Sequence, residues 1–257
     1  MKFGVQTFTV RKAQKRCIKD AYMPLIGIGI KSFEVARIKF NKKNAIKIKK
    51  LIDEYGIEIL SLQVKPKDVF KSADRVVEFC NVTGCKRVVI SMLPFECILG
   101  SEARFYRFLD SLDSWCDTYS KSGITLAYHH HNWEYIRLSN GKTRMAELLE
   151  KTEKLKFVHD TYWTAKSGVA PEAQIREFGN RLLGIHLRDL TFKKRGIDVI
   201  GCDGAIGDGV IDFRSVLSAA SEVGCSYYVI EQKTKNPYRD IEKSFTRLCE
   251  TAKGVNL

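Results

Sequence analysis

The chain has 257 residues, of which 44% are apolar and 28% are charged, and its formal net charge is +13. This is the composition of an ordinary globular protein, and no run approaches the roughly 18 apolar residues that a membrane helix needs. Residues 1–5 begin directly in a strand-like segment and lack the apolar core of a signal peptide. We therefore expect a cytoplasmic protein with no membrane partner.

The positive charge raises the question of nucleic-acid binding. The basic residues are dispersed, however, and in residues 41–50 they cover one face of a predicted helix whose opposite face carries Ala45 and Ile48. We interpret the charge as a solvated basic surface and expect no nucleic-acid partner. A basic site that attracts anionic substrates is the alternative.

Eight short segments, rich in β-branched residues and apolar on both faces, predict the strands of a parallel sheet. In chain order they are residues 2–9, 32–36, 58–64, 87–92, 124–129, 156–160, 184–188 and 227–231. Helical patterns follow them at residues 13–22, 44–55, 68–83, 102–121, 143–153, 171–178 and 213–223, and a last helix opens at residues 236–237. Pro24 is expected to end the first helix, because its ring disfavours a helical residue before it. Residues 201–209, rich in glycine, are interpreted as a mobile loop over the mouth of the barrel.

Eight strand–helix units in a chain of this length predict a (β/α)8 TIM barrel. No linker and no shift in composition divides the sequence, so residues 1–257 are predicted to form one domain. The alternative is a doubly wound open sheet, which usually carries a glycine-rich phosphate-binding turn after its first strand. Residues 6–11 contain no glycine, and we therefore favour the barrel.

All five histidines lie at the ends of predicted strands. His129, His130 and His131 follow the fifth strand, while His159 and His186 belong to the sixth and seventh. Since the chemistry of a TIM barrel is placed at the C-terminal strand ends, the histidines predict one site assembled from several strands. Strand alternation places His129 and His131 toward the mouth and His130 on the other face.

Four polar residues at the ends of the last four strands form a candidate metal site: His129, Asp160, His186 and Glu231. One such residue alone is more often a cap or a satisfied polar group. Four in register on consecutive strands predict that the side chains meet around one ion. Two imidazoles and two carboxylates suit Mn²⁺, Co²⁺ or Zn²⁺, with Mg²⁺ as a further choice, and open positions would leave room for a chelating substrate.

Several segments resemble, in the right order, motifs of the xylose isomerase-like TIM-barrel superfamily, the group of sugar phosphate isomerases, epimerases and related lyases. The strand GITLAYHHHNWE at residues 123–134 is similar to the family's G-V-x-L-x-Y-H-N-H-x-x-E. The other similar segments are residues 3–11, 159–163, 184–189, 206–213 and 229–232. The resemblance implies that Asp160, His186 and Glu231 bind a divalent metal and that the substrate is a small carbohydrate.

Two positions depart from the family's pattern. His129 stands where many members have a glutamate that binds the metal and also acts as an acid or base, and Glu134 is the nearby residue able to supply that second carboxylate. Gln63 stands where many members have a histidine. It is able to hydrogen-bond a hydroxyl group but is no strong base, so these departures leave the type of proton transfer open.

The resemblance implies an isomerase, an epimerase or a related lyase that acts on a sugar or keto-polyol through a metal-stabilised enediolate. We expect Glu231 to be the principal catalytic residue, with Glu134 as a second one. The candidate substrate-binding residues are His131, Trp163, Arg188, Gln6 and Gln63. Arg188 would either hold a phosphate or carboxylate group or pair with a neighbouring acid.

Two other functions are weighed against this one. The endonuclease IV enzymes of DNA repair share the fold, but they need histidines on the third and fourth strands, and this chain has no histidine before His129. A non-catalytic sugar-binding barrel is the other alternative, and the departures at His129 and Gln63 keep it open. A homo-oligomer is compatible with each of these functions.

Overall fold

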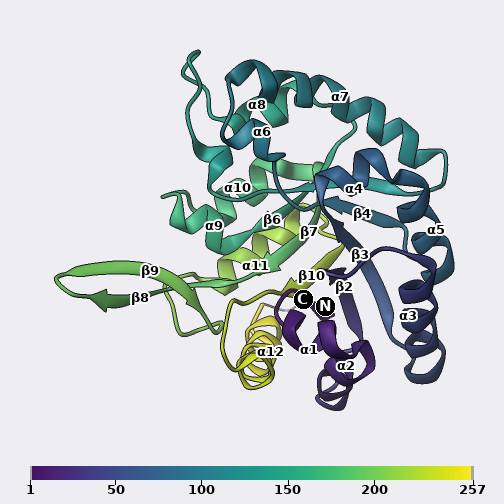
Figure 1. Cartoon of the computed structure of the whole chain (residues 1–257). Helices are drawn as coiled ribbons and strands as arrows, with labels where there is room; N and C mark the ends of the chain where they lie inside the picture. The colour runs from purple at the N-terminus through teal and green to yellow at the C-terminus, as the bar shows by residue number, and fades with distance from the viewer. Residues whose placement is uncertain (1, 256–257) are drawn as a thin grey trace.

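The computed structural model describes residues 2–255, and its centre is a closed barrel of eight parallel strands (Figure 1). The strand order is β1-β10-β7-β6-β5-β4-β3-β2, so the first and last strands pair and close the barrel. The barrel strands are β1 (Phe3–Gln6), β2 (Ser32–Ala36), β3 (Glu58–Val64), β4 (Arg87–Ile90), β5 (Thr125–His129), β6 (Lys156–Asp160), β7 (Leu182–Leu187) and β10 (Tyr227–Ile230). The prediction of a (β/α)8 barrel is confirmed. Residue 1 and residues 256–257 of the predicted domain lie outside the described residues.

Helices surround the barrel (Figure 1). They are α1 (Arg11–Arg16), α2 (Ile18–Gly27), α3 (Lys42–Tyr55), α4 (Pro66–Lys71), α5 (Ala73–Thr83), α6 (Phe95–Ile98), α7 (Glu102–Ser120), α8 (Arg144–Lys151), α9 (Thr161–Lys166), α10 (Pro171–Phe178), α11 (Phe213–Glu222) and α12 (Pro237–Lys253), with short 3-10 turns η1 (Trp133–Tyr135) and η2 (Gly179–Arg181). Within residues 2–255, no helix combines the length and the apolar character needed to cross a membrane.

The first helical region differs from the prediction. Cys17 has an extended backbone and divides the region into α1 and α2, and α2 continues through Pro24 to Gly27. Proline lacks the N–H that would bond to the preceding turn, so α2 gives up one hydrogen bond at this point. Tyr22 and Leu25, on either side of Pro24, are fully buried. Their packing stabilises the helix beyond the proline. The expectation that the helix ends before Pro24 is therefore wrong.

The strands are apolar on both faces because each face packs against a different layer. Side chains on the outer face pack against the helices in one large core. A smaller cluster fills the barrel itself: Leu60, Val89, Ala127, Val158, Leu183, Tyr227 and Val229. Tyr227 crosses this interior close to β7, where a Cβ atom at Gly184 would lie 2.2 Å from its ring. Gly184 thus makes room for Tyr227.

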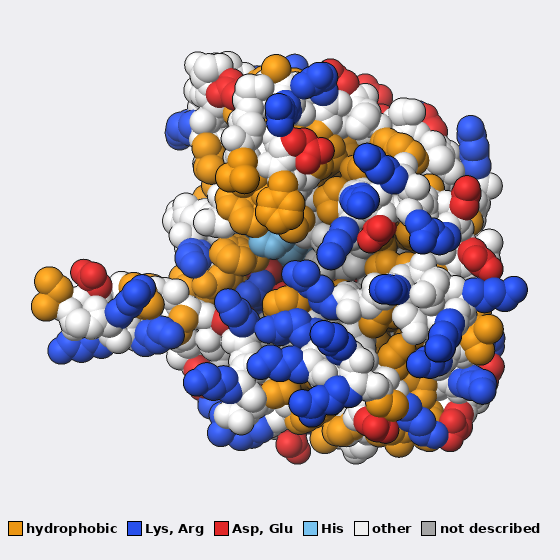
Figure 2. Space-filling view, in the orientation of Figure 1, with side chains coloured by type: hydrophobic (Ala, Val, Ile, Leu, Met, Phe, Trp, Pro, Cys, Tyr) orange, Lys and Arg blue, Asp and Glu red, His pale blue; other side chains and the backbone are white. Residues whose placement is uncertain are grey.

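A two-stranded antiparallel hairpin follows β7 and projects from the barrel (Figures 1 and 2). Its strands are β8 (Asp189–Arg195) and β9 (Asp198–Gly204), and they form a sheet separate from the barrel. The interpretation of residues 201–209 as a loop is therefore wrong for residues 201–204, which belong to β9, whereas residues 205–209 lie outside the strands and helices. The glycines that suggested a loop fit the pairing instead, because a Cβ atom at Gly204 would lie 2.3 Å from the Thr191 side chain across the hairpin.

Candidate active site

The carboxyl ends of β5, β6 and β7 and the residue after β10 bring four polar side chains together in the barrel mouth. His129, Asp160, His186 and Glu231 are buried, and each offers one ligand atom that lies within 4.8 Å of the other three. His186 Nδ1 and Glu231 Oε2 are 2.8 Å apart, and His129 Nε2 lies 3.4 Å from Asp160 Oδ2. Figure 2 shows a histidine surface at this place, between hydrophobic and basic side chains. The four predicted ligands therefore meet, while their binding of a metal stays a prediction.

Asp160 is held in place by the start of α9. Its Oδ1 accepts a hydrogen bond from the Trp163 N–H at 2.9 Å, so that Asp160 is the N-cap of this helix. The backbone N–H of Asp160 donates to His130 Nε2 at 3.0 Å. Because Oδ1 serves the cap, Oδ2 is the oxygen that faces His129 and Arg188. Asp160 thus offers the cluster a single oxygen.

The five histidines form two groups on opposite faces of the strands. In the mouth, the ring of His129 lies 4.4 Å from that of His186 and 4.8 Å from that of His131. Behind the strands, the nearest nitrogens of His130 and His159 are 3.3 Å apart, and both rings approach Phe178 of α10. His130 points away from the mouth, as the alternation predicts. The prediction of one site that contains all five histidines is wrong, because His159 faces the helices as well.

Glu34 of β2 belongs to the site but was not identified from the sequence. It is fully buried, and its Oε1 lies 2.7 Å from His186 Nε2. His186 is thus placed between two carboxylates, with Glu34 at Nε2 and Glu231 at Nδ1. The available signal was an acidic residue in the middle of the otherwise uncharged strand Ser32–Ala36.

Arg188 adds a positive charge to the cluster. Its Nη1 lies 3.1 Å from Asp160 Oδ2 and 3.5 Å from Glu231 Oε1, and its Nη2 pairs with Asp203 of β9. Three carboxylates therefore share one buried guanidinium group, which is the ion-pair alternative considered for this residue. An anionic group of a substrate would have to compete with these carboxylates. Asp203 was not predicted, because its segment was interpreted as a loop.

The pKa values in the cluster follow from these pairings. Burial disfavours the charged forms of Asp160 and Glu231, but Arg188 and the neighbouring histidines together outweigh it, and the pKa of each carboxyl group lies below its usual value. Burial would also lower the pKa of His186, yet Glu34 and Glu231 raise it to about 10. At neutral pH the cluster accordingly holds ionised carboxylates beside a protonated His186.

The donor atoms fit a divalent cation. Both ring nitrogens of His129 are buried, and neither has a hydrogen-bond partner among the described residues. A buried polar atom without a partner is costly, so such atoms usually mark a missing ligand, water or ion. A cation at the point where His129, Asp160, His186 and Glu231 converge would give one of these two nitrogens a partner. This set of two nitrogens and two oxygens suits Mn²⁺, Co²⁺ or Zn²⁺.

Glu134 does not join the cluster. Its Oε1 accepts a hydrogen bond from the Tyr128 hydroxyl, and its Oε2 accepts one from the His131 N–H at 2.7 Å. The ring of Tyr128 lies 6.4 Å from that of Phe108 in α7, on the side of the helices. Burial raises the pKa of Glu134. Its carboxyl group fixes the turn after β5, and its role in proton transfer stays a prediction.

The candidate substrate-binding residues line two sides of the mouth. The ring of His131 lies 5.2 Å from that of Trp163 and 5.0 Å from that of Trp133. Burial holds the pKa of His131 well below its usual value, so this ring is neutral. On the opposite half of the barrel, Gln6 Nε2 donates to Gln63 Oε1 at 2.6 Å. The mouth thus has an aromatic wall on one side and a pair of amides on the other.

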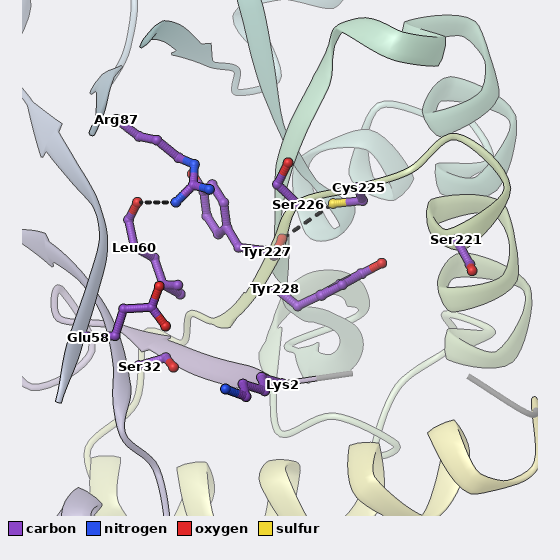
Figure 3. Close-up of a pocket in the computed structure, with 10 residues that line it drawn as sticks. All are labelled: Lys2, Ser32, Glu58, Leu60, Arg87, Ser221, Cys225, Ser226, Tyr227 and Tyr228. Atoms are coloured by element: carbon purple, nitrogen blue, oxygen red, sulfur yellow. Dashed lines mark hydrogen bonds between the residues drawn. The ribbon is translucent and has the colours of Figure 1, made fainter. Parts of the chain in front are cut away.

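A cavity of about 450 Å³ lies at the other end of the barrel, beside the amino ends of the strands (Figure 3). Lys2, Glu58 and Arg87 line it, and Arg87 donates to the Leu60 carbonyl at 3.2 Å. This end of a TIM barrel generally serves stability and the opposite end serves catalysis. We therefore place the candidate active site at the mouth.

Comparison with known proteins agrees with this fold. The sequence profile described as xylose isomerase-like TIM barrel matches residues 26–251. The chain is 24% identical over 155 residues to an inosose dehydratase of Geobacillus thermodenitrificans, and the match covers 53% of this chain and about half of that protein, 49%.

Solved structures show the same fold at low sequence identity. A sugar phosphate isomerase/epimerase from Parabacteroides distasonis superposes with a TM-score of 0.77 at 18% identity, covering 97% of this chain and 94% of the other. A xylose isomerase-like TIM barrel protein from Mycobacterium smegmatis in complex with magnesium has a TM-score of 0.69 at 11% identity, covering 92% and 88%. The chain thus belongs to the family of xylose isomerase-like TIM barrels.

Proposed function

We propose that this protein is a divalent-metal-dependent isomerase or epimerase, or a related lyase, that acts on a sugar or keto-polyol. The observation that carries the proposal is the convergence of His129, Asp160, His186 and Glu231 within 4.8 Å in the barrel mouth. The unpartnered nitrogens of His129 and the ionised carboxylates support it.

These four residues would hold one ion, either Mn²⁺, Co²⁺, Zn²⁺ or Mg²⁺. The imidazoles favour the first three, because Mg²⁺ prefers oxygen ligands. When bound, the ion would polarise a substrate carbonyl and stabilise the negative charge that develops on its oxygen. Asp160 contributes one oxygen, since its other oxygen caps α9.

Glu231 is the residue to which we assign proton transfer. Its Oε2 is engaged by His186, while Oε1 contacts Arg188 at 3.5 Å and is the freer oxygen. A proton would pass from the substrate carbon beside the carbonyl to Oε1. The C–H electron pair would become the C=C bond of an enediolate, and the carbonyl oxygen would take up the negative charge. Reprotonation of the former carbonyl carbon gives isomerisation, and reprotonation of the original carbon from the opposite face gives epimerisation. Loss of a β-substituent gives elimination.

The rest of the mouth is suited to a polyol. His131 and Trp163 present an aromatic wall that a sugar face is able to pack against. Gln6 and Gln63 bring amide groups that are able to hydrogen-bond hydroxyl groups. The cytoplasmic location and the homo-oligomer suggested by the sequence remain parts of the proposal.

Hydrogen exchange tests this function directly. The protein is loaded with Mn²⁺ and incubated in D₂O with a panel of ketoses and inososes, and the C–H signal beside the carbonyl is followed by proton NMR. We expect exchange with at least one compound and none with the Asp160→Ala variant. Metal-dependent binding without exchange would favour the non-catalytic sugar-binding barrel. Exchange that persists in the metal-free protein would contradict the proposal.

A further inference from the structure

Glu34 lies beside the candidate metal site without being one of the four predicted ligands. It comes from β2, on the far side of His186 from Glu231. The Nδ1 atom of His186 lies 2.8 Å from Glu231 Oε2 in the mouth, whereas Nε2 is 2.7 Å from Glu34 Oε1. The two carboxylates therefore contact different nitrogens of one imidazole ring.

The Glu34 carboxyl group is itself fixed by two hydroxyl groups. Its Oε2 accepts hydrogen bonds from Ser61 Oγ of β3 at 2.5 Å and from the Tyr227 hydroxyl of β10 at 3.0 Å. Tyr227 reaches this place through the barrel interior, beside the notch that Gly184 leaves in β7. Glu34, Ser61 and Tyr227 are all buried, so the carboxyl group cannot turn away into solvent.

The contact between Glu34 and His186 influences which nitrogen of His186 is available to bind a metal. A neutral imidazole binds a cation through one nitrogen and carries its proton on the other, and the partner of that proton decides which nitrogen is free. In metal sites the proton is commonly donated to a carboxylate, which orients the ring and makes it a stronger ligand. Oε1 of Glu34 and Nε2 of His186 form an ion-pair contact at 2.7 Å, and neither atom has a hydrogen-bond partner among residues 2–255.

We propose that Glu34 is a positioning residue that keeps the proton of His186 on Nε2 and directs the lone pair of Nδ1 into the barrel mouth. This inference rests on the proposed function, because it assumes that His186 binds the ion. Glu34 acts through His186 and touches neither the substrate nor the ion. Ser61 and Tyr227 hold it in the orientation that this task requires.

Metal affinity separates this role from a purely structural one. We compare Mn²⁺ binding to the wild type, Glu34→Gln and Glu34→Ala by competition with a fluorescent chelator. Glu34→Ala is expected to bind about 100-fold more weakly, and Glu34→Gln about 10-fold more weakly because its amide oxygen still accepts the Nε2 proton. Glu147→Gln is the matched control: it removes the charge of another buried carboxylate, in α8, outside the mouth. Its affinity should equal that of the wild type.

A spectroscopic measurement keeps the inference testable if the alanine variant folds poorly. In ¹⁵N-labelled, metal-loaded protein, long-range ¹⁵N–¹H spectra report which nitrogen of His186 carries the proton. We expect the Nε2–H form in the wild type and a weaker preference for it in folded Glu34→Gln, because a neutral amide oxygen is a poorer acceptor of this proton than a carboxylate. Folded Glu34 variants with wild-type affinity and the same Nε2–H form would overturn the inference and leave the proposed function standing. A wild-type protein that binds no Mn²⁺ would overturn both.

Discussion

The two groups of histidines are separated by one layer of strands, yet their chemistry is opposite. His186 in the mouth contacts Glu34 and Glu231, and its pKa is raised to about 10 despite burial. His130 on the helical side is equally buried but contacts no carboxylate among the described residues, and burial lowers its pKa to about 3. The comparison shows that the neighbouring charges, and not the depth of burial, decide which histidines are suited to hold a proton or an ion.

The strongest test of this comparison is the removal of the Asp160 carboxylate from the mouth, for which we expect the largest effect. We expect Asp160→Ala to retain no measurable divalent metal and no turnover, because it removes the carboxylate that faces both His129 and Arg188. Metal analysis of the purified variant is the measurement. Asp160→Asn is the matched variant, since its amide oxygen preserves the cap of α9. If Asp160→Asn kept its full metal content, the loss of metal in Asp160→Ala would be due to the missing N-cap of α9 and not to the missing carboxylate.

The next largest effect is expected for Glu231→Gln. The variant preserves the shape of the side chain and one oxygen but removes the base, so we expect wild-type-like folding and a loss of at least about 100-fold in turnover. The rate of deuterium exchange at the carbon beside the substrate carbonyl is the measurement. Undiminished exchange would transfer the role to His129 or Glu134.

A smaller effect concerns pH. The pKa of His186 is about 10, so at pH 7 its imidazole carries a proton that a metal at Nδ1 must displace. We therefore expect about one proton to be released per ion, and Mn²⁺ affinity to rise about tenfold per pH unit up to about pH 10. Calorimetry in two buffers of different ionisation enthalpy counts the proton. Binding without proton release would mean that His186 is no ligand.

The smallest effect is expected on the helical side of the strands. His159→Phe removes the contact with His130, and we expect a loss of about 1–3 kcal/mol in the free energy of unfolding, because a buried polar group loses a partner. Mn²⁺ affinity should stay within about threefold of the wild type. Chemical denaturation and the chelator competition measure the two quantities. A large loss of affinity would show that the two histidine groups are coupled through Asp160, which lies next to His159 in the chain.

Much of the fold could be predicted, because parallel strands are apolar on both faces and glycines such as Gly56 end the helices between them. The hairpin could not, since an exposed two-stranded sheet has no buried face to leave a pattern in the sequence. In the site, the convergence of Asp160, His186 and Glu231 follows from strand order. The approach of Glu34 to His186 depends on side chains that cross the barrel interior between β2 and β7, and no periodicity along one strand records such a contact.

The hairpin gives the site a component that is independent of the barrel. Asp203, which pairs with Arg188, arrives on β9, and β9 forms hydrogen bonds with β8 and with no barrel strand. Changes in the length or sequence of the hairpin would therefore alter the charge beside Arg188 without breaking a hydrogen bond of the barrel. The preference for charged or neutral substrates would then be open to change by mutation in this hairpin, while the residues that perform the chemistry stay fixed.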